Sequence, residues 1–311
     1  MTGRRFKAAE GSDEPGHGDR SVRELAARTI RLRLQAVWRG LHAACGDLDD
    51  GESVHRLRVA TRRAIAAFDA FDDLVPDGGG RWFRRRLRRI RRSAGDARDL
   101  DVLVERISGD SPPSSGVTAR RRLIAMLARQ RPAARQSVIE QRERLAESNW
   151  SGRAGRLVDR IAQGGHAPPP AAYCRRRMKR LVSRFFDRAS RGPRRAGELH
   201  RLRIDGKRLR YSLEILAPVL PPSHRAKCEK TLESLQESLG RYTDHAAIAE
   251  RLRRWPTRGV VTEDRRLLEA MRRAEADAAD SARRGFVRWW TRSRRRALQK
   301  RFRRALRKEP A

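Results

Sequence analysis

The string His-Arg-Leu-Arg, with an aliphatic residue on each side, occurs twice in this chain of 311 residues. Residues 54–59 read VHRLRV and residues 199–204 read LHRLRI, so the second copy follows the first by 145 positions. The same offset, without a gap, pairs Arg63 with Arg208, Leu87 with Leu232, Gly95 with Gly240 and Asp99 with Asp244. Solenoid repeats recur every 20 to 50 residues or so, and a much longer period indicates two copies of a whole folding unit. We therefore expect a chain of two related halves.

Apolar residues recur at three and four positions through most of the chain, which is the period of an α-helix. The pattern is clear over residues 22–46 and again over residues 173–190. No segment keeps the alternation of a β-strand for long. Stretches rich in Gly, Pro, Ser or Asp interrupt the pattern near residues 46–53, 76–80, 95, 108–116, 164–170 and 192–197. We predict an all-α fold with about four helices in each half, long enough to pack as bundles.

The domain boundaries follow from the same breaks. Residues 1–19 are polar and rich in Gly, which is typical of a flexible leader. We expect one folded unit over residues 20–307, with a first helical half at 20–163 and a second at 171–307. The linker 164–170, which reads GGHAPPP, lies between the two halves.

The net charge of +36, from 74 Lys and Arg against 38 Asp and Glu, narrows the choice of partners. Such an imbalance destabilises the compact state unless a polyanion or counterions offset it. Nucleic acid, an anionic membrane and an inorganic polyanion are the candidate partners. Of the 74 basic residues 67 are Arg, whose planar fork binds two phosphate oxygens at once. Codon bias in a GC-rich genome explains a general excess of Arg equally well. Only the positions of individual arginines can therefore indicate a binding site.

The repeated string lies on a predicted helix with two opposite faces. At about 100° per residue, one face of residues 54–71 is apolar and the other is basic. The apolar face holds Val54, Leu57, Ala60, Ala64, Phe68 and Phe71. The candidate ligand residues of the basic face and its flanks are His55, Arg56, Arg58, Arg62 and Arg63, and in the second copy His200, Arg201, Arg203, Lys207, Arg208, Arg210 and Tyr211.

The two histidines indicate which ligand suits these faces. A solvated surface explains the arginines but not a histidine held within one turn of two of them. That positive potential disfavours the protonated imidazole unless an anion is present, and it repels a divalent metal. A neutral imidazole can donate one hydrogen bond to a phosphate oxygen, and it gains charge when the phosphate binds. We favour an anion site here over a metal site.

A second basic stripe follows on the next predicted helix of the first half. It contains Arg81, Arg85, Arg88 and Arg92, opposite an apolar face. The duplicate positions are Ala226, Lys230, Glu233 and Glu237. We therefore expect two halves alike in fold but not in charge, with the first holding anions more strongly.

Two further segments leave alternatives open. Asp99 and Asp101 suggest a metal or general-base site, but only Asp99 recurs, as Asp244. We favour capping between a helix that ends at Gly95 and the next one, or an ion pair that orients an arginine. The basic C-terminal run 286–308 carries Trp289, Trp290 and Phe302. These aromatic residues either stack on nucleic-acid bases or enter a membrane surface, or they pack on the second half.

The remaining composition excludes several classes of protein. Cys45, Cys174 and Cys228 are widely spaced, which supports neither a disulfide framework nor a zinc site. No apolar run resembles a signal peptide or a membrane span. We expect a cytoplasmic protein without a cofactor.

The strings VHRLRVATRR (54–63) with GDARDLDVL (95–103), and LHRLRIDGKRLRYSLEIL (199–216) with LQESLGRYTDHAAIAERL (235–252), resemble the two halves of a CHAD domain. The resemblance covers roughly residues 20–307. It implies two four-helix bundles related by a pseudo-two-fold axis, whose motif helices face a shared central groove. It also implies binding of inorganic polyphosphate without a catalytic step. We expect the protein in the cytoplasm, in association with polyphosphate granules. Gly206 departs from the pattern, because a residue other than Gly is more usual within the second motif helix.

These observations together predict a non-enzymatic protein that binds polyphosphate. The first alternative is a module that binds DNA or RNA without sequence preference. The second, less favoured, is a metal-dependent phosphohydrolase that uses His55, His200, Asp99 and Asp244. No single predicted helix spaces these four residues as metal ligands, and the basic surroundings oppose the entry of a metal ion.

Overall fold

The computed structural model describes residues 21–46, 50–109, 117–192, 194–216, 222–255 and 260–307. These residues form eleven α-helices and one short 3-10 helix (η1, Asp72–Leu74), and no strand occurs among them. The predicted all-α fold class is confirmed. The expected flexible leader, residues 1–19, lies outside the described residues.

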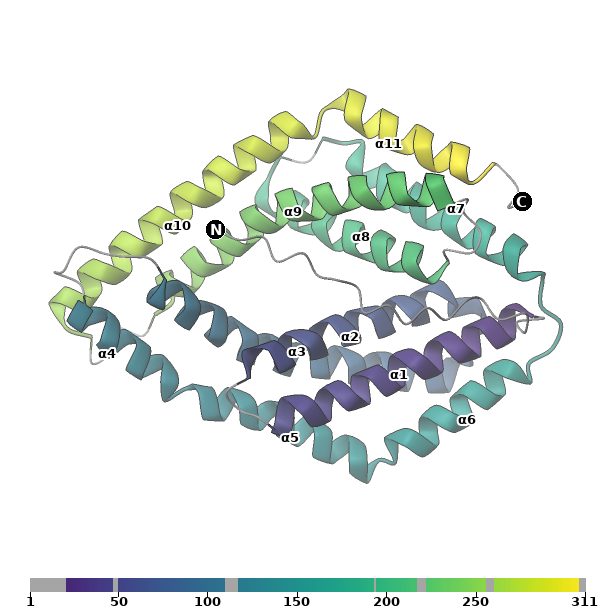
Figure 1. Cartoon of the computed structure of the whole chain (residues 1–311), viewed down its shortest axis with the longest axis horizontal. Coiled ribbons are helices and arrows are strands. Elements are labelled where there is room, and N and C mark those ends of the chain that lie inside the picture. The colour runs from purple at the N-terminus through teal and green to yellow at the C-terminus, as the bar shows by residue number, and fades with distance from the viewer. Residues whose placement is uncertain are drawn as a thin grey trace.

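Each half has inner helices and helices along its outer edge (Figure 1). The inner helices are α1 (Val22–Gly46), α2 (Gly51–Ala70) and α3 (Asp77–Ser108) in the first half, and α7 (Pro170–Ala189), α8 (Ala196–Ile215) and α9 (Pro222–Arg253) in the second. The outer helices are α4 (Val117–Ala128), α5 (Arg131–Glu147) and α6 (Trp150–Ala162), and in the second half α10 (Thr262–Trp289) and α11 (Arg292–Ala305). The two motif helices, α2 and α8, pack on each other where the halves meet.

The helix bounds repeat at the offset found in the sequence. Adding 145 to the bounds of α2, 51 and 70, gives 196 and 215, which are the bounds of α8. The bounds of α3, 77 and 108, give in the same way 222 and 253, those of α9. The duplicated strings therefore have the same local structure in both copies.

The outer segment differs between the halves, and so the number of helices differs from the predicted four per half. In the first half the helix breaks before α5, which has Pro132 in its first turn. Proline lacks the N–H group that a continuing helix needs, so a helix can begin at this residue but not run through it. Asn149, in a left-handed conformation, then caps α6. At the position that duplicates Pro132 the second half has Asp277, and α10 runs through it without a break.

Gly95 does not end a helix as predicted, because α3 continues through it and α9 continues through Gly240. Glycine costs about 1 kcal/mol of helix propensity relative to alanine. Apolar residues before and after Gly95 bury one side of α3, namely Leu87, Ile90, Ala94, Ala97 and Leu100. Their packing outweighs the local preference of one residue.

The two halves also meet at the end of the molecule opposite the linker. There a second apolar cluster joins α3 and α4 to α9 and α10 through Leu103, Ile107, Leu123, Leu252 and Leu268. Ion pairs connect the same elements, from Arg122 to Asp264 at 2.7 Å and from Arg106 to Glu275 at 2.8 Å. This cluster and the chain connection between α6 and α7 hold the halves together on two sides of the motif helices (Figure 1).

The aromatic residues of the C-terminal run belong to the core. Trp290 and Phe302 are 3% and 0% exposed, and Trp289 stacks on Trp290 at 5.6 Å between ring centroids. Of the two alternatives left open by the sequence, packing on the second half is the one confirmed. The three cysteines are free. Within the described ranges, no helix combines the length and the apolar character needed to cross a membrane.

Candidate functional site

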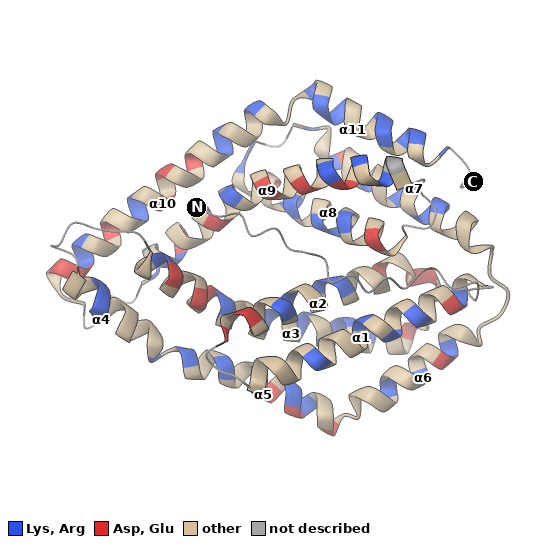
Figure 2. Cartoon of the chain, in the orientation of Figure 1, with Lys and Arg blue, Asp and Glu red and all other residues tan. Residues whose placement is uncertain are grey.

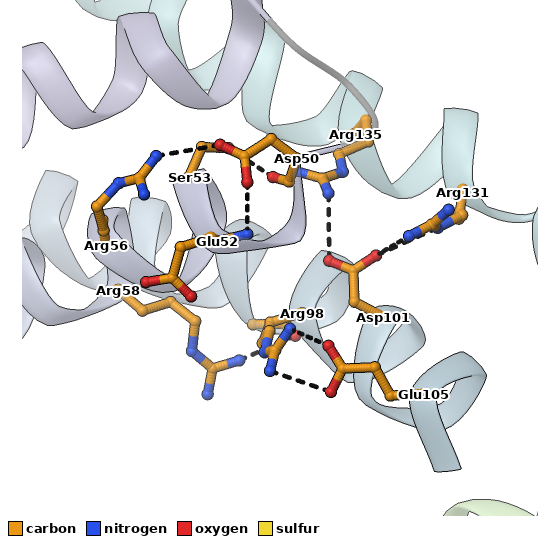
Figure 3. Close-up of polar contacts among 11 residues, drawn as sticks. Asp50, Glu52, Ser53, Arg56, Arg58, Arg98, Asp101, Glu105, Arg131 and Arg135 are labelled. Atoms are coloured by element: carbon orange, nitrogen blue, oxygen red, sulfur yellow. Dashed lines mark hydrogen bonds and ion pairs between the residues drawn. The ribbon is translucent and has the colours of Figure 1, made fainter. Parts of the chain in front are cut away.

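The first turn of α2 fixes the start of the basic face. Asp50 caps the helix by accepting a hydrogen bond from the backbone N–H of Glu52 at 2.8 Å, and Arg56 pairs with the same carboxylate at 3.0 Å (Figure 3). Such a cap stabilises a helix because it satisfies an N–H group of the first turn that has no partner within the helix. Arg56, one of the predicted ligand residues, is thus an exposed residue that already has a carboxylate partner.

One carboxylate orients the central arginine of each motif helix. Arg58 pairs with Asp99 at 3.4 Å and also donates a hydrogen bond to the backbone carbonyl of Gly95 at 3.1 Å. The duplicate pair, Arg203 with Asp244, has a separation of 3.3 Å. Of the two roles proposed for Asp99, the ion pair is confirmed and capping is wrong, because Asp99 lies in the middle of α3.

Arg62 lies where the basic faces of the two halves meet. Burial lowers the pKa of His55, Arg58 and Arg91 in the first half, and the charge of Arg62 lowers each further. The same two causes act on the pKa of Arg203 and Lys207 in the second half. Like charges interact this strongly only at short range, within about 10 Å at ordinary salt. The motif helices therefore bring their cations together, as the resemblance to a CHAD domain implies.

We call the residues that converge around Arg62 the central basic cluster. It consists of His55, Arg58, Arg62, Arg91 and Arg98 from the first half, and Arg203 and Lys207 from the second. Figure 2 shows the blue segments on α2, α3 and α8 that carry these cations. Three carboxylates pair with members of the cluster, Asp99 with Arg58, Asp244 with Arg203 and Glu105 with Arg98. Among the described residues, Arg62, Arg91 and Lys207 make no ion pair.

Lys207 has the most strongly changed pKa of the cluster. Burial, with Arg62 and Arg203 next to it, lowers this pKa to about 7, although Asp244 opposes the change. At neutral pH, Lys207 is therefore neutral in a large fraction of the protein molecules that have no anion bound. An anion placed beside it would favour the charged ammonium group again.

The two histidines are placed differently. His55 is partly buried, and its pKa is lowered first by burial and then by Arg98, Arg62 and Arg58, against the effect of Glu52. The sequence predicted this direction from the arginines alone, whereas burial is the larger cause. His200 is exposed near the start of α8.

Two members of the cluster, Arg91 and Arg98, were missed in the sequence. They are seven residues apart on α3, which is two helical turns, so they share one flank of the helix. Arg98 also donates a hydrogen bond to Glu105 at 2.9 Å, and Figure 3 places it beside Arg58. The spacing of seven residues indicates that the two arginines lie on the same flank of α3. The apolar pattern, however, does not show which flank of α3 faces α2.

The predicted stripe on α3 is exposed along its length and reaches the cluster only in part. Arg88 and Arg92 lie near Arg91, because their charges contribute to its lowered pKa after burial and Arg62. Arg85 instead acts on Arg86, whose pKa is lowered by burial and then by neighbours on α3, α5 and α6. Arg81 is 3.9 Å from Asp77 at the start of the helix.

Arg63 and Arg208, predicted to flank the ligand, tie the two halves together instead. Arg63 pairs with Glu214 at 3.2 Å, and Arg208 pairs with Asp69 at 3.1 Å. Positions 63 and 208 are duplicates, as are 69 and 214, so the two contacts are the same contact made in both directions. Such reciprocity is typical of an interface with two-fold symmetry. It supports the predicted pseudo-two-fold relation, whose axis stays a prediction.

The remaining predicted residues lie at the edge of the cluster. Tyr211 is buried at 5% exposure, and Arg210 covers its ring at 5.2 Å from the centroid. The Arg210 charge also acts on Lys207. Arg201 is exposed. Tyr211 therefore supports Arg210 and is not an open surface for a ligand.

Packing between α8 and α9 explains the glycine at position 206. A β-carbon at this position would lie 2.4 Å from Nε2 of Gln236 and 2.8 Å from a methyl carbon of Leu235, both on α9. Glycine thus permits the close approach of α8 and α9 behind Arg203 and Lys207. The first half has Thr61 at the duplicate position, which is buried and donates a hydrogen bond to the carbonyl of Leu57 at 2.8 Å.

The carboxylates proposed for the alternative metal site are engaged by arginines. Asp99 and Asp244 lie on different helices and each faces a guanidinium group. In the part of the chain that the structure describes, no group of three or more His, Cys, Asp or Glu residues is arranged to hold a metal ion. Asp101, the third candidate carboxylate, is buried between Arg131 and Arg135 at 2.8 and 3.2 Å (Figure 3).

Comparison with known proteins gives both a family and a fold. The CHAD domain family model matches residues 28–253, most of the chain. The structure is similar to the crystal structure of the CHAD domain from the plant Ricinus communis, with a TM-score of 0.61 and 22% identity over 91% of this chain and 92% of that one. It is also similar to PptA from Streptomyces chartreusis, with a TM-score of 0.63 and 18% identity over 87% of this chain and 99% of that one. No curated protein matches the chain.

Proposed function

The chain belongs to the CHAD domain family, and from this premise we propose that its central basic cluster binds inorganic polyphosphate. The observation that carries the proposal is the position of Arg62, which interacts with cations of both motif helices. A ligand held there must present many negative charges within a short length. Polyphosphate is a uniform string of such charges.

The chemistry of the cluster fits a ligand without bases. Its members are His, Arg and Lys, and the nearby aromatic residue, Tyr211, is covered by Arg210. Guanidinium groups bind phosphate oxygens in pairs, and His55 can add one hydrogen bond. Recognition of this kind depends on charge density and needs no platform on which a base could stack.

We propose further that the protein binds without turning over its ligand. The two carboxylates that meet the motif arginines, Asp99 and Asp244, hold Arg58 and Arg203 in place. Their role is to position the cations. Incubation with long-chain polyphosphate and Mg²⁺ or Mn²⁺ should release no phosphate above the level of a protein-free control. Release that disappears on changing Asp99 to Asn would refute this part of the proposal.

The direct test is a pair of binding isotherms at physiological salt, one with long-chain polyphosphate and one with single-stranded DNA. Polyphosphate should bind more tightly. Arg62→Glu should remove most of that affinity, whereas Arg85→Glu, the same charge change on the exposed side of α3, should have a small effect. The helical circular dichroism of both variants should stay unchanged. An equal decrease in the two variants would mean that net charge, and not the cluster, determines binding.

The cytoplasm, and polyphosphate granules within it, is the location we propose for this binding. A fluorescent fusion of the chain should collect on granules. The Arg62→Glu variant should remain dispersed, and a variant that still collects would separate granule association from the cluster.

A further inference from the structure

A second cationic surface lies on α11, at the outer edge of the second half (Figure 1). One side of this helix is buried through Leu298, Phe302 and Ala305, where it packs against α7 and α9. The opposite side carries a stripe of five exposed cations, Arg292, Arg296, Lys300, Arg303 and Arg307. Their spacing of four, four and three residues keeps the first four on one face of the helix, and Arg307 follows in the turn after the last helical residue, Ala305. We call these five residues the α11 stripe.

The α11 stripe differs from the other basic helices of the second half, because none of its cations pairs with an acidic residue of the described ranges. On α10, Arg272 and Arg273 pair with Glu269 at 2.7 and 3.0 Å, and Arg283 pairs with Asp280 at 3.2 Å. Residues 281–307 contain no Asp or Glu. Among the described residues, none of the five stripe cations makes an ion pair, and Figure 2 shows blue segments on α11 without red ones.

Repulsion among the stripe cations destabilises the protein, and no acidic residue of the described chain offsets this repulsion. Like charges three or four residues apart destabilise a helix by about 0.2 to 0.5 kcal/mol for each pair. Within α11 the stripe contains three such neighbouring pairs. Burial of the apolar side holds the helix in spite of this cost. A bound polyanion would turn the repulsion into attraction.

The buried face of α11 narrows the kind of polyanion. Trp290 and Phe302 are in the core, and Arg294 covers the ring of the half-buried Trp289 at 4.7 Å from its centroid, so none of the three is an open surface for an unpaired base. Leu298 and Ala305 are buried as well, and the stripe itself has no apolar residue to enter a lipid bilayer. What remains is a straight row of charges about 20 Å long, at about 1.5 Å per residue over the 14 residues of the helix.

We propose that the α11 stripe binds the phosphate backbone of double-stranded nucleic acid, without sequence preference and independently of the central basic cluster. A duplex is a stiff polyanion with one charge per 1.7 Å or so of its axis. The helix holds its cations in a fixed row, so a stiff duplex binds without the ordering of either backbone, whereas a flexible single strand loses backbone conformational entropy on binding. The stripe faces away from the body of the protein, so a duplex and a polyphosphate chain can be held at the same time.

The test measures binding of a short mixed-sequence DNA duplex to the full chain over a range of salt concentrations. The variant Arg296→Gln, Lys300→Gln, Arg303→Gln and Arg307→Gln removes four stripe cations. It should bind the duplex at least about tenfold more weakly, and the slope of log affinity against log salt should fall by about 0.9 for each phosphate that the variant no longer neutralises. Its affinity for polyphosphate should change little. The wild-type chain should bind the duplex more tightly than a single strand of the same sequence.

A matched control removes four other exposed arginines, in the variant Arg121→Gln, Arg129→Gln, Arg265→Gln and Arg266→Gln at the α4 and α10 end. Equal weakening in this control would show an effect of net charge and overturn the proposal. Failure of Arg62→Glu to bind the duplex would place the duplex on the central cluster, and this too would overturn it. Binding to phosphatidylserine vesicles that depends on the stripe, without duplex binding, would identify a membrane as the partner and overturn the proposal as well. Failure of polyphosphate binding alone refutes the function proposed above and leaves this inference standing.

Discussion

The two halves of the molecule share a scaffold and differ in what they place around it. Both carry an arginine oriented by an aspartate, Arg58 by Asp99 and Arg203 by Asp244, at 3.4 and 3.3 Å. Along the third helix of each half the charges diverge. The first half has Arg84, Arg88, Arg91 and Arg98, where the second has Glu229, Glu233, Gln236 and Thr243. The ion pairs that orient the motif arginines recur, whereas the charges along the third helix do not.

This difference predicts that the two halves contribute differently to the binding of short and long polyphosphate chains. A long polyphosphate chain can engage cations of both halves at once, and the second contact is then intramolecular. A short chain reaches one half, and the first half offers more cations. Affinity should therefore rise steeply with chain length. Short chains should depend mainly on the first half.

The largest expected effect comes from removing the motif cations of one half at a time. Arg58→Gln with Arg62→Gln should weaken both tripolyphosphate and long-chain polyphosphate by about a hundredfold, at about 1.5 kcal/mol for each charge-assisted hydrogen bond removed. Arg203→Gln with Lys207→Gln should weaken long chains much more than tripolyphosphate. Isothermal titration calorimetry with both ligands checks this. Equal affinity of tripolyphosphate and long chains for the wild type, per binding site, would show that the halves act separately.

A smaller effect should come from the one motif position where the type of cation differs, Arg62 in the first half and Lys207 in the second. The pKa of Lys207 is lowered to about 7 by burial and by Arg62 and Arg203, below its unfolded value of about 10.4. Between these two values the unfolded chain holds the extra proton, so this residue makes the free protein more stable as pH rises. A bound polyanion favours the proton, so binding takes one up. Affinity should fall by up to about tenfold for each pH unit above 7.

Lys207→Arg tests this assignment, because an arginine stays charged throughout the range. The variant should bind polyphosphate with nearly the same affinity from about pH 7 to about pH 9, and the wild type should not. His55 titrates below this window, since burial and the neighbouring arginines lower its pKa. A pH dependence that persists unchanged in Lys207→Arg would assign the proton to another group.

Exchange of charge between the halves should have a more modest effect. Glu233→Arg with Gln236→Arg gives α9 the residues that α3 has at Arg88 and Arg91. We expect tripolyphosphate to bind several-fold more tightly, because the second half then resembles the first. A control, Glu237→Arg, changes the charge by two units, against three in the double variant, at the duplicate of Arg92, where the side chain lines a pocket between α9 and α10. An equal gain from the control would indicate a general effect of net charge, which is screened at higher salt.

The sequence predicted well what depends on local spacing. Helical periodicity indicates the all-α class, and the offset of 145 indicates the correspondence of α2 with α8 and of α3 with α9. Asp99 recurs as Asp244, which indicates that this aspartate interacts with the repeated motif. Each of the two aspartates does form an ion pair with a motif arginine.

What the sequence could not predict depends on how helices turn against each other. The partner of Arg63 is Glu214, 151 positions away, and no local pattern links them. Arg91 and Arg98 join the cluster because α3 turns one flank toward α2, and the apolar face fits either choice of flank. The helix through Gly95 follows from packing that outweighs a local preference.

The smallest effect we expect concerns the scaffold itself, at the position where the first half has Thr61 and the second has Gly206. Gly206→Ala places a methyl group 2.4 Å from Nε2 of Gln236 and 2.8 Å from Leu235. Overpacking of about 1 to 3 kcal/mol should outweigh the gain in helix propensity of about 1 kcal/mol, so the free energy of unfolding should fall by about 1 kcal/mol. Gly285→Ala, inside α10 with nothing within 4 Å of the new β-carbon, should raise it instead. Thermal unfolding of the two variants measures the difference. If Gly206→Ala were as stabilising as Gly285→Ala, the close approach of α8 and α9 would not be the reason that glycine stands in the second motif helix.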